Sequence, residues 1–205
     1  MTQIHDLTVL ELAAGIRGGE LAPVEITAHY LDRIEALNAD VGAFYTVTAD
    51  LARDQAAAAE KAVARAGDPA SLPPLTGVPI PIKDLNMVAG VRQTFGSLVY
   101  QDNVPDESDH VSAALRAAGA VMPGKTATPE FGLPCYTETA IGPPARTPWD
   151  LSRSARSWSR CSRAGRTRAW PSCPASPRPP RAAPRRHGRS RRGRCRSRPG
   201  SRASA

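Results

Sequence analysis

Apolar residues recur at helical spacing in three segments near the start of the chain. The first predicts a helix from Val9 to about Ile16, which Gly18-Gly19 ends. The second predicts a helix that opens at Pro23 and ends near Asn38. The third predicts a helix over 49–66. Because this third segment is rich in alanine, it indicates close packing against a larger body.

Strand signals follow and alternate with a fourth helix. A β-branched and aromatic run predicts a short strand over 44–48. Apolar residues alternate with two prolines in 75–84, which favours an outer or irregular strand because proline donates no ladder hydrogen bond. Carboxylates at 106–109 precede a helix whose expected apolar stripe is Val111, Ala114, Leu115 and Ala118. Gly119 ends that helix and a strand is expected to start at 120–122, so the fold class is α/β.

The composition changes abruptly after Ser152. Residues 153–205 contain 17 arginines but no acidic residue and no Val, Ile, Leu, Met, Phe or Tyr. All 19 acidic residues lie in 1–152, which therefore carry a net charge of −9, whereas the remainder carries +17. A segment without aliphatic side chains cannot bury enough apolar area to offset the entropy of ordering. We expect a folded domain over 1–152 and a disordered tail, rich in Arg, Pro and Ser, over 153–205.

Such a basic tail suggests an alternative function, nonspecific binding of nucleic acid or another polyanion. Trp158 and Trp170 are the only stacking side chains in the tail, and they precede its densest arginine cluster. The four cysteines show no Cys-x-x-Cys spacing, so no metal site is expected. No secretory signal and no membrane span are visible, which makes the cytoplasm the default location.

Residues 119–126 fit the phosphate-loop pattern G-x-x-x-x-G-K-T. That loop needs a strand before it and a helix after it, so that backbone N–H groups point at phosphate. Here a helix precedes the pattern, its middle is apolar, and Pro129 disfavours a following helix. Nucleotide binding is therefore not expected.

Lys83 ends the apolar strand and is followed by Asp84. From the residues alone, the ordinary interpretation is a strand-end lysine with its ammonium in water. Catalytic use is the alternative, because lysines with perturbed chemistry occur mainly where they are buried.

Several segments together resemble the amidase signature family. They are 75–85 (Leu-Thr-Gly-Val-Pro-Ile-Pro-Ile-Lys-Asp-Leu), Thr94-Phe95-Gly96-Ser97, 109–118, 120–132 with its Gly-Lys-Thr-Ala-Thr-Pro-Glu-Phe-Gly turn, and Pro148-Trp149-Asp150-Leu151-Ser152-Arg153-Ser154. Thr147 stands where the pattern would have Asn. The resemblance implies an incomplete amidase signature fold, with N-terminal helices and the first strands and helices of a mixed sheet. Family members are more than twice as long.

The resemblance also implies a chemistry. The family hydrolyses amides, or transfers ammonia, with a Ser–cis-Ser–Lys triad and no cofactor, and Lys83 corresponds to the triad lysine. Both serines should follow Ser154 in Gly/Ser-rich motifs, yet the sequence continues Ala155-Arg156-Ser157-Trp158 and contains no such motif. We therefore expect an inactive fragment of an enzyme for small-molecule amides. A frameshift in a GC-rich gene would account for the tail.

Overall fold

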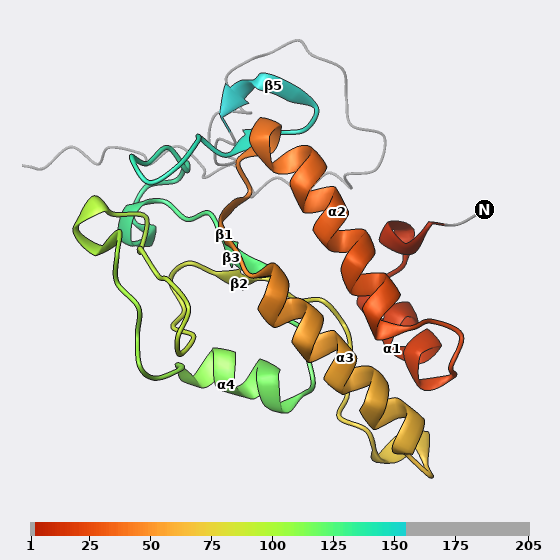
Figure 1. Ribbon diagram of the computed structural model, residues 1–205. Coiled ribbons are helices and arrows are strands. Elements are labelled where there is room, and N and C mark those ends of the chain that lie inside the picture. Colours follow the sequence, from red (N-terminus) through yellow and green to blue (C-terminus); the bar gives the residue numbers. More distant parts are fainter. Residues whose placement is uncertain (1–2, 155–205) are drawn as a thin grey trace, which may run out of the picture. The chain divides into compact units, whose positions relative to one another are not determined.

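A computed structural model describes residues 3–154 of the 205-residue chain and, for Asp150 and residues 152–154, only the backbone. The described part contains the helices α1 (Val9–Arg17), α2 (Pro23–Val41), α3 (Ala49–Arg65) and α4 (His110–Ala117). Its strands are β1 (Phe44–Val47), β2 (Ile82–Lys83), β3 (Gly124–Thr126), β4 (Arg146–Thr147) and β5 (Asp150–Ser154) (Figure 1). Single 3-10 turns lie at Ile4–Asp6, Pro69–Ser71, Leu98–Tyr100 and Glu130–Gly132. None of the described helices is long and apolar enough to cross a membrane.

The first two helices begin where the sequence predicts. Thr8 caps α1, with Glu11 N–H donating to its hydroxyl at 3.2 Å and its own N–H donating to the Glu11 carboxylate at 2.7 Å. Pro23 opens α2. The expected end of α2 near Asn38 is wrong, because the helix continues to Gly42, which adopts the left-handed conformation at φ 59°. The Asn38 side chain instead bonds both main-chain groups of Phe44, which ties the last turns of α2 to β1.

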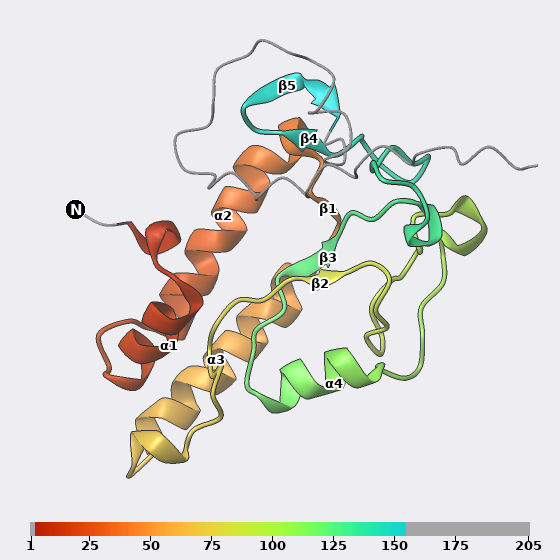
Figure 2. The same ribbon diagram turned by 180° about the vertical axis from the view of Figure 1, so that it is seen from behind.

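The alanine-rich helix α3 packs closely, as predicted. Ala52 and Ala56 are fully buried against Leu31 of α2 and Val121. Short side chains let the helix axes approach, so α2 and α3 run side by side. In both views α3 lies between α2 and α4 (Figures 1 and 2).

The larger sheet has the strand order β1-β3-β2, with β1 antiparallel and β2 parallel to β3. The expected irregular outer strand is confirmed: only Ile82–Lys83 of the segment 75–84 is a regular strand, and it lies at the edge of the sheet. The expected start of a strand at 120–122 is wrong, because β3 begins at Gly124. Val121 makes only an isolated bridge with Pro79, and the Met122 N–H bonds the Gln55 side chain at 2.8 Å instead of a strand. Pro123 has no N–H, and the ladder begins at the next residue.

The hydrophobic core lies where helices cover the sheet. Residues of α1 and α2 pack with Val78, whereas Ile82, Met122 and Val91 pack with Leu51 of α3 and Leu115 of α4. The apolar stripe expected on α4 is only partly correct: Val111 is 52% exposed, and Ser112 is the residue of this helix that is buried. The mixed α/β fold with a partial sheet agrees with the expected fold class. The expected tail, apart from Arg153 and Ser154, lies outside the described residues.

Candidate active site

Lys83 lies at the carboxyl end of the edge strand β2. Its backbone pairs with Thr126 of β3, and the next residue, Asp84, donates its N–H to the Thr126 carbonyl at 3.0 Å. Side chains alternate across a strand, so Ile82 and Asp84 are buried whereas Lys83 is exposed. The ammonium has no hydrogen bond or ion pair with any residue of 3–154. Because β2 and β3 are parallel, Lys83 lies at the sheet edge where α/β proteins bind ligands.

The buried lysine of this region is Lys125, on the neighbouring strand. It is 0% exposed, and its ammonium lies 3.2 Å from Oδ1 of Asp84, which is also fully buried. Nζ donates a second bond to the Asn86 carbonyl at 2.7 Å. Burial lowers the pKa of Lys125, and the Asp84 carboxylate opposes this shift by favouring the charged form. The sequence had singled out Lys125 only as part of the phosphate-loop pattern.

Asp84 also holds the loop that carries the Thr94-Phe95-Gly96-Ser97 motif. Its Oδ2 accepts hydrogen bonds from the N–H and the hydroxyl of Thr94, and the same hydroxyl accepts the Gly96 N–H at 3.0 Å. A Cβ at Gly96 would lie 2.7 Å from the Thr128 carbonyl oxygen, so only glycine fits at this approach. Asp84 therefore joins the end of β2 to this loop and to Lys125 of β3.

Two Phe-Gly dipeptides meet beside this carboxylate. Phe95 and Phe131 both have positive φ, 53° and 49°, and Phe131 donates its N–H to the Phe95 carbonyl at 2.8 Å. Their rings are stacked at 6.3 Å between centroids, and Tyr100 packs edge-on against both. Left-handed backbone at a bulky residue costs about 1–3 kcal/mol and persists only where the surroundings impose it. The two turns thus form a rigid wall near the end of β2.

A chain of hydrogen bonds continues from Lys125 to the start of α4. The Asn86 carbonyl accepts from Lys125, and the Asn86 side chain donates to Asp109 Oδ2 at 2.8 Å. Asp109 caps α4 by accepting the Ser112 N–H at 2.8 Å and also accepts the Met87 N–H at 3.0 Å. Burial would raise the pKa of Asp109, but these hydrogen bonds outweigh it and hold the pKa below its usual value.

Replacing Asp109 by alanine should lower the free energy of unfolding by about 1–2 kcal/mol at neutral pH, because α4 loses its cap and Asn86 its acceptor. The lowered pKa means that this contribution is present above the ordinary carboxyl value of 3.8 and is lost as the pH falls through the lower folded-state value. Urea unfolding of both proteins at neutral and acidic pH checks this expectation. Asp106→Ala, at an exposed position of the preceding loop, is the control. If the free energies of unfolding of wild type and Asp109→Ala differed by the same amount in neutral solution and in strong acid, the expected pH dependence would be wrong.

The described residues contain neither of the two serines expected to complete the triad with Lys83. Those expected after Ser154 lie outside the described part of the chain, and the Ser152 and Ser154 side chains are likewise not described. Within residues 3–154, no group of three or more His, Cys, Asp or Glu side chains could hold a metal ion. In that same stretch, Cys135 is exposed and has a free thiol.

Comparisons with known proteins agree on one family. The model of the amidase family matches residues 25–156. The chain is 41% identical over 150 residues to a glutamyl-tRNA(Gln) amidotransferase subunit from a Geobacter species, covering 73% of this chain and 30% of that protein. It is 39% identical over 155 residues to a putative amidase of a Synechocystis species, covering 76% of this chain and 31% of the relative.

A solved structure gives the same result. Peptide amidase from Stenotrophomonas maltophilia superposes with a TM-score of 0.64 at 30% identity, covering 73% of this chain and 31% of that one. The chain therefore spans about 30% of the length of the relatives that it matches.

Proposed function

This chain belongs to the amidase family, and on that premise we propose that it is an N-terminal fragment of a hydrolase for carbon–nitrogen bonds in small amides, with Lys83 as the family's catalytic lysine. The observation that carries the proposal is the position of Lys83. It stands in the family-like segment 75–85, at the carboxyl end of a strand parallel to its neighbour. Its backbone pairs with Thr126 of β3 next to the buried Asp84–Lys125 pair, while its own side chain is exposed. We also propose a cytoplasmic location.

The proposed chemistry needs three groups acting together. A serine oxygen attacks the amide carbonyl carbon, and a second serine passes the nucleophile's proton to the lysine. The C–N bond breaks as the amine leaves with that proton, and water then hydrolyses the acyl-serine to release the acid and the free serine. The lysine accepts a proton only when it is neutral, which requires burial or a neighbouring cation. In residues 3–154 Lys83 is exposed, so we propose that the part of the family fold absent from this stretch covers it in a complete enzyme.

We propose that the 205-residue chain is inactive. A lysine without nucleophile and relay has nothing to activate, and losing members of such a unit removes nearly all covalent catalysis. After Ser154 the sequence reads Ala155-Arg156-Ser157, and no Ser-Ser-Gly-Gly or Gly-Gly-Ser follows. The abrupt change to Arg, Pro, Ser, Ala and Gly supports a shift of reading frame within a GC-rich stretch.

Sequencing the gene across the codons for 150–160 tests this origin. We expect one of the other two frames to encode a Gly/Ser/Ala-rich segment directly after Ser154, followed by a Gly-Ser-rich turn some tens of codons later. Both alternative frames lacking such a segment would contradict the frameshift. The membership of residues 25–156 in the family would be unaffected by that result.

A second candidate function rests on residues 153–205, which contain 17 arginines and no acidic residue. We propose that this segment binds polyanions without sequence preference. A fluorescent single-stranded DNA of mixed sequence should bind the full chain at low salt. The affinity should fall on the order of 10³-fold between about 50 and about 200 mM salt if about seven phosphates are neutralised. Residues 1–152 alone are the control and should not bind. Equal binding by that control, or sequence-selective binding that survives the higher salt, would contradict the proposal.

A further inference from the structure

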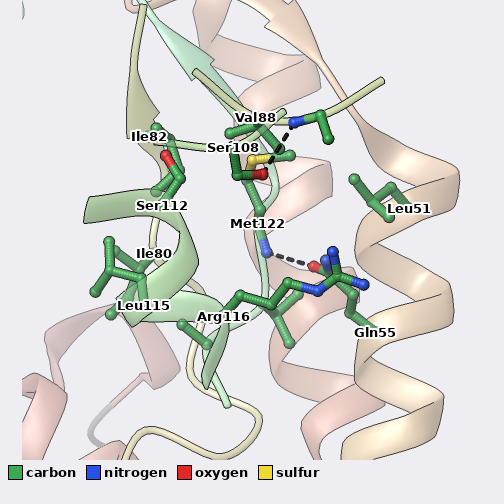
Figure 3. A pocket seen from close by; sticks show the side chains of 13 residues that line it. Leu51, Gln55, Ile80, Ile82, Val88, Ser108, Ser112, Leu115, Arg116 and Met122 are labelled. Atoms are coloured by element: carbon green, nitrogen blue, oxygen red, sulfur yellow. Dashed lines mark hydrogen bonds between the residues drawn. The ribbon is translucent and has the colours of Figure 1, made fainter. Parts of the chain in front are cut away.

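A small cavity lies between α3, α4 and the two segments 80–82 and 120–122, on the face of the sheet that these helices cover (Figure 3). Its volume is about 80 Å³. Most of its wall is aliphatic, and the side chains that form this part are Leu51, Ile80, Ile82, Val88, Leu115 and Met122. Lys83 does not line it, since Ile82 points into the core and its neighbour in the strand does not.

The polar groups of this cavity share one property: each has a hydrogen left to donate. The Ser112 hydroxyl is buried, with the residue 6% exposed, and has no partner among the described residues. Ser108 accepts the Ala89 N–H at 3.0 Å, and its own hydroxyl hydrogen is left over. Gln55 accepts the Met122 N–H through Oε1, so its NH₂ group is available.

The cavity also has a cation at its rim. Arg116 of α4 extends toward Gln55 of α3 (Figure 3). Its guanidinium makes no ion pair within the part of the chain that the structure describes. A pocket with aliphatic walls, several donors and an unpaired guanidinium is complementary to an anion that accepts hydrogen bonds and carries an apolar tail. Arginine binds carboxylates through two parallel N–H groups.

We propose that this cavity binds a short aliphatic monocarboxylate. The carboxylate lies between Arg116 and the Gln55 amide, and the tail packs against the aliphatic wall beside Met122. The volume sets the size of the tail: 80 Å³ corresponds to roughly two or three water volumes, which holds a tail of about two or three carbons while the carboxylate lies at the rim. The site is independent of the proposed amide hydrolysis and of Lys83, because no residue of the proposed triad lines it.

The test titrates the full chain with isobutyrate and, separately, with isobutyramide, its neutral counterpart of nearly the same shape. Methyl NMR at about 0.15 M salt follows Ile82 and Met122, which both line the cavity. We expect saturable shifts with isobutyrate and a Kd on the order of 1–10 mM, in keeping with so small a ligand. Isobutyramide should bind at least tenfold more weakly. The absence of saturation up to about 50 mM, or equal binding of the two compounds, would overturn the proposal.

Variants locate the ligand within the cavity. Arg116→Gln removes the rim cation at an exposed position and should weaken isobutyrate binding at least fivefold, without changing the already weak isobutyramide binding. Arg53→Gln, on the exposed face of α3 where Arg53 pairs with Asp50, is the matched control and should bind as the wild type does. Ser112→Val fills the cavity and should abolish binding. Because this buried change can impair folding, Arg116→Gln decides: unchanged isobutyrate affinity in that variant would refute the site.

Discussion

Lys83→Ala should lower kcat for amide hydrolysis by about 10²–10⁴-fold in a version of the chain whose reading frame continues in the family pattern beyond Ser154. The physical reason is that the lysine takes the nucleophile's proton. The neighbouring Lys125 cannot replace it, because its ammonium is fully buried and paired with Asp84. Alanine cannot accept a proton, whereas substrate contacts elsewhere are unaffected. The loss should therefore appear in kcat, with KM nearly unchanged. Steady-state kinetics on a simple aliphatic amide measures both.

Lys61→Ala is the matched control for this experiment. Lys61 is exposed on α3, far along the chain from the proposed site, and its removal should leave kcat within about twofold of the parent. Comparable losses in the two variants would show that lysine removal acts through stability. An undiminished kcat in Lys83→Ala would exclude Lys83 as the base.

Lys125→Met should lower the free energy of unfolding by about 3–5 kcal/mol. The substitution keeps most of the side-chain volume but leaves the Asp84 carboxylate buried without a counter-charge, and it deprives the Asn86 carbonyl of a donor. Burial lowers the pKa of Lys125 below its ordinary 10.5. At pH values between the folded-state pKa and 10.5, the unfolded chain therefore binds more protons than the folded chain does. The wild type should gain stability over this range, and the variant should lack that gain. Urea unfolding at several pH values measures both effects.

A double-mutant cycle separates the ion pair from general damage. Asp84→Asn alone should also be destabilising, because it leaves the Lys125 ammonium unpaired, but the double variant Lys125→Met/Asp84→Asn should lose less than the two single losses combined. Lys61→Met, at an exposed position, should cost less than about 0.5 kcal/mol. Additive losses in the cycle would mean that the 3.2 Å contact contributes no coupling.

The sequence was sufficient for the features that depend on neighbours in the chain. The sequence predicts helix starts at Val9 and Pro23, and α1 and α2 begin at these residues. Three alanines of α3, Ala52, Ala56 and Ala59, are buried against the rest of the fold, as their small size favours. The order of the short motifs along the sequence indicates the family, and the match of the family model over residues 25–156 confirms it.

The features that were missed depend on contacts between distant segments. Lys125 and Asp84 are 41 positions apart, and nothing local distinguishes the buried lysine from the exposed Lys83. Both lie in strand-like segments. Only the register Ile82–Lys125 decides which side chain points inward. The strand expected at 120–122 failed for a similar reason, since a hydrogen bond from Gln55 of α3 takes the Met122 N–H. Ser112, likewise, is buried by the way α4 rotates against the sheet.

We propose that this polypeptide retains the lysine of an amide hydrolase but lacks both of its serine partners. The most direct measurement is intact mass and peptide mapping after incubation with a serine-reactive fluorophosphonate, with the frame-restored protein as the positive control. We expect a covalent adduct on one serine of the frame-restored protein and none on the 205-residue chain. A stoichiometric adduct on any serine of residues 154–205 of this chain, lost in Lys83→Ala, would contradict it.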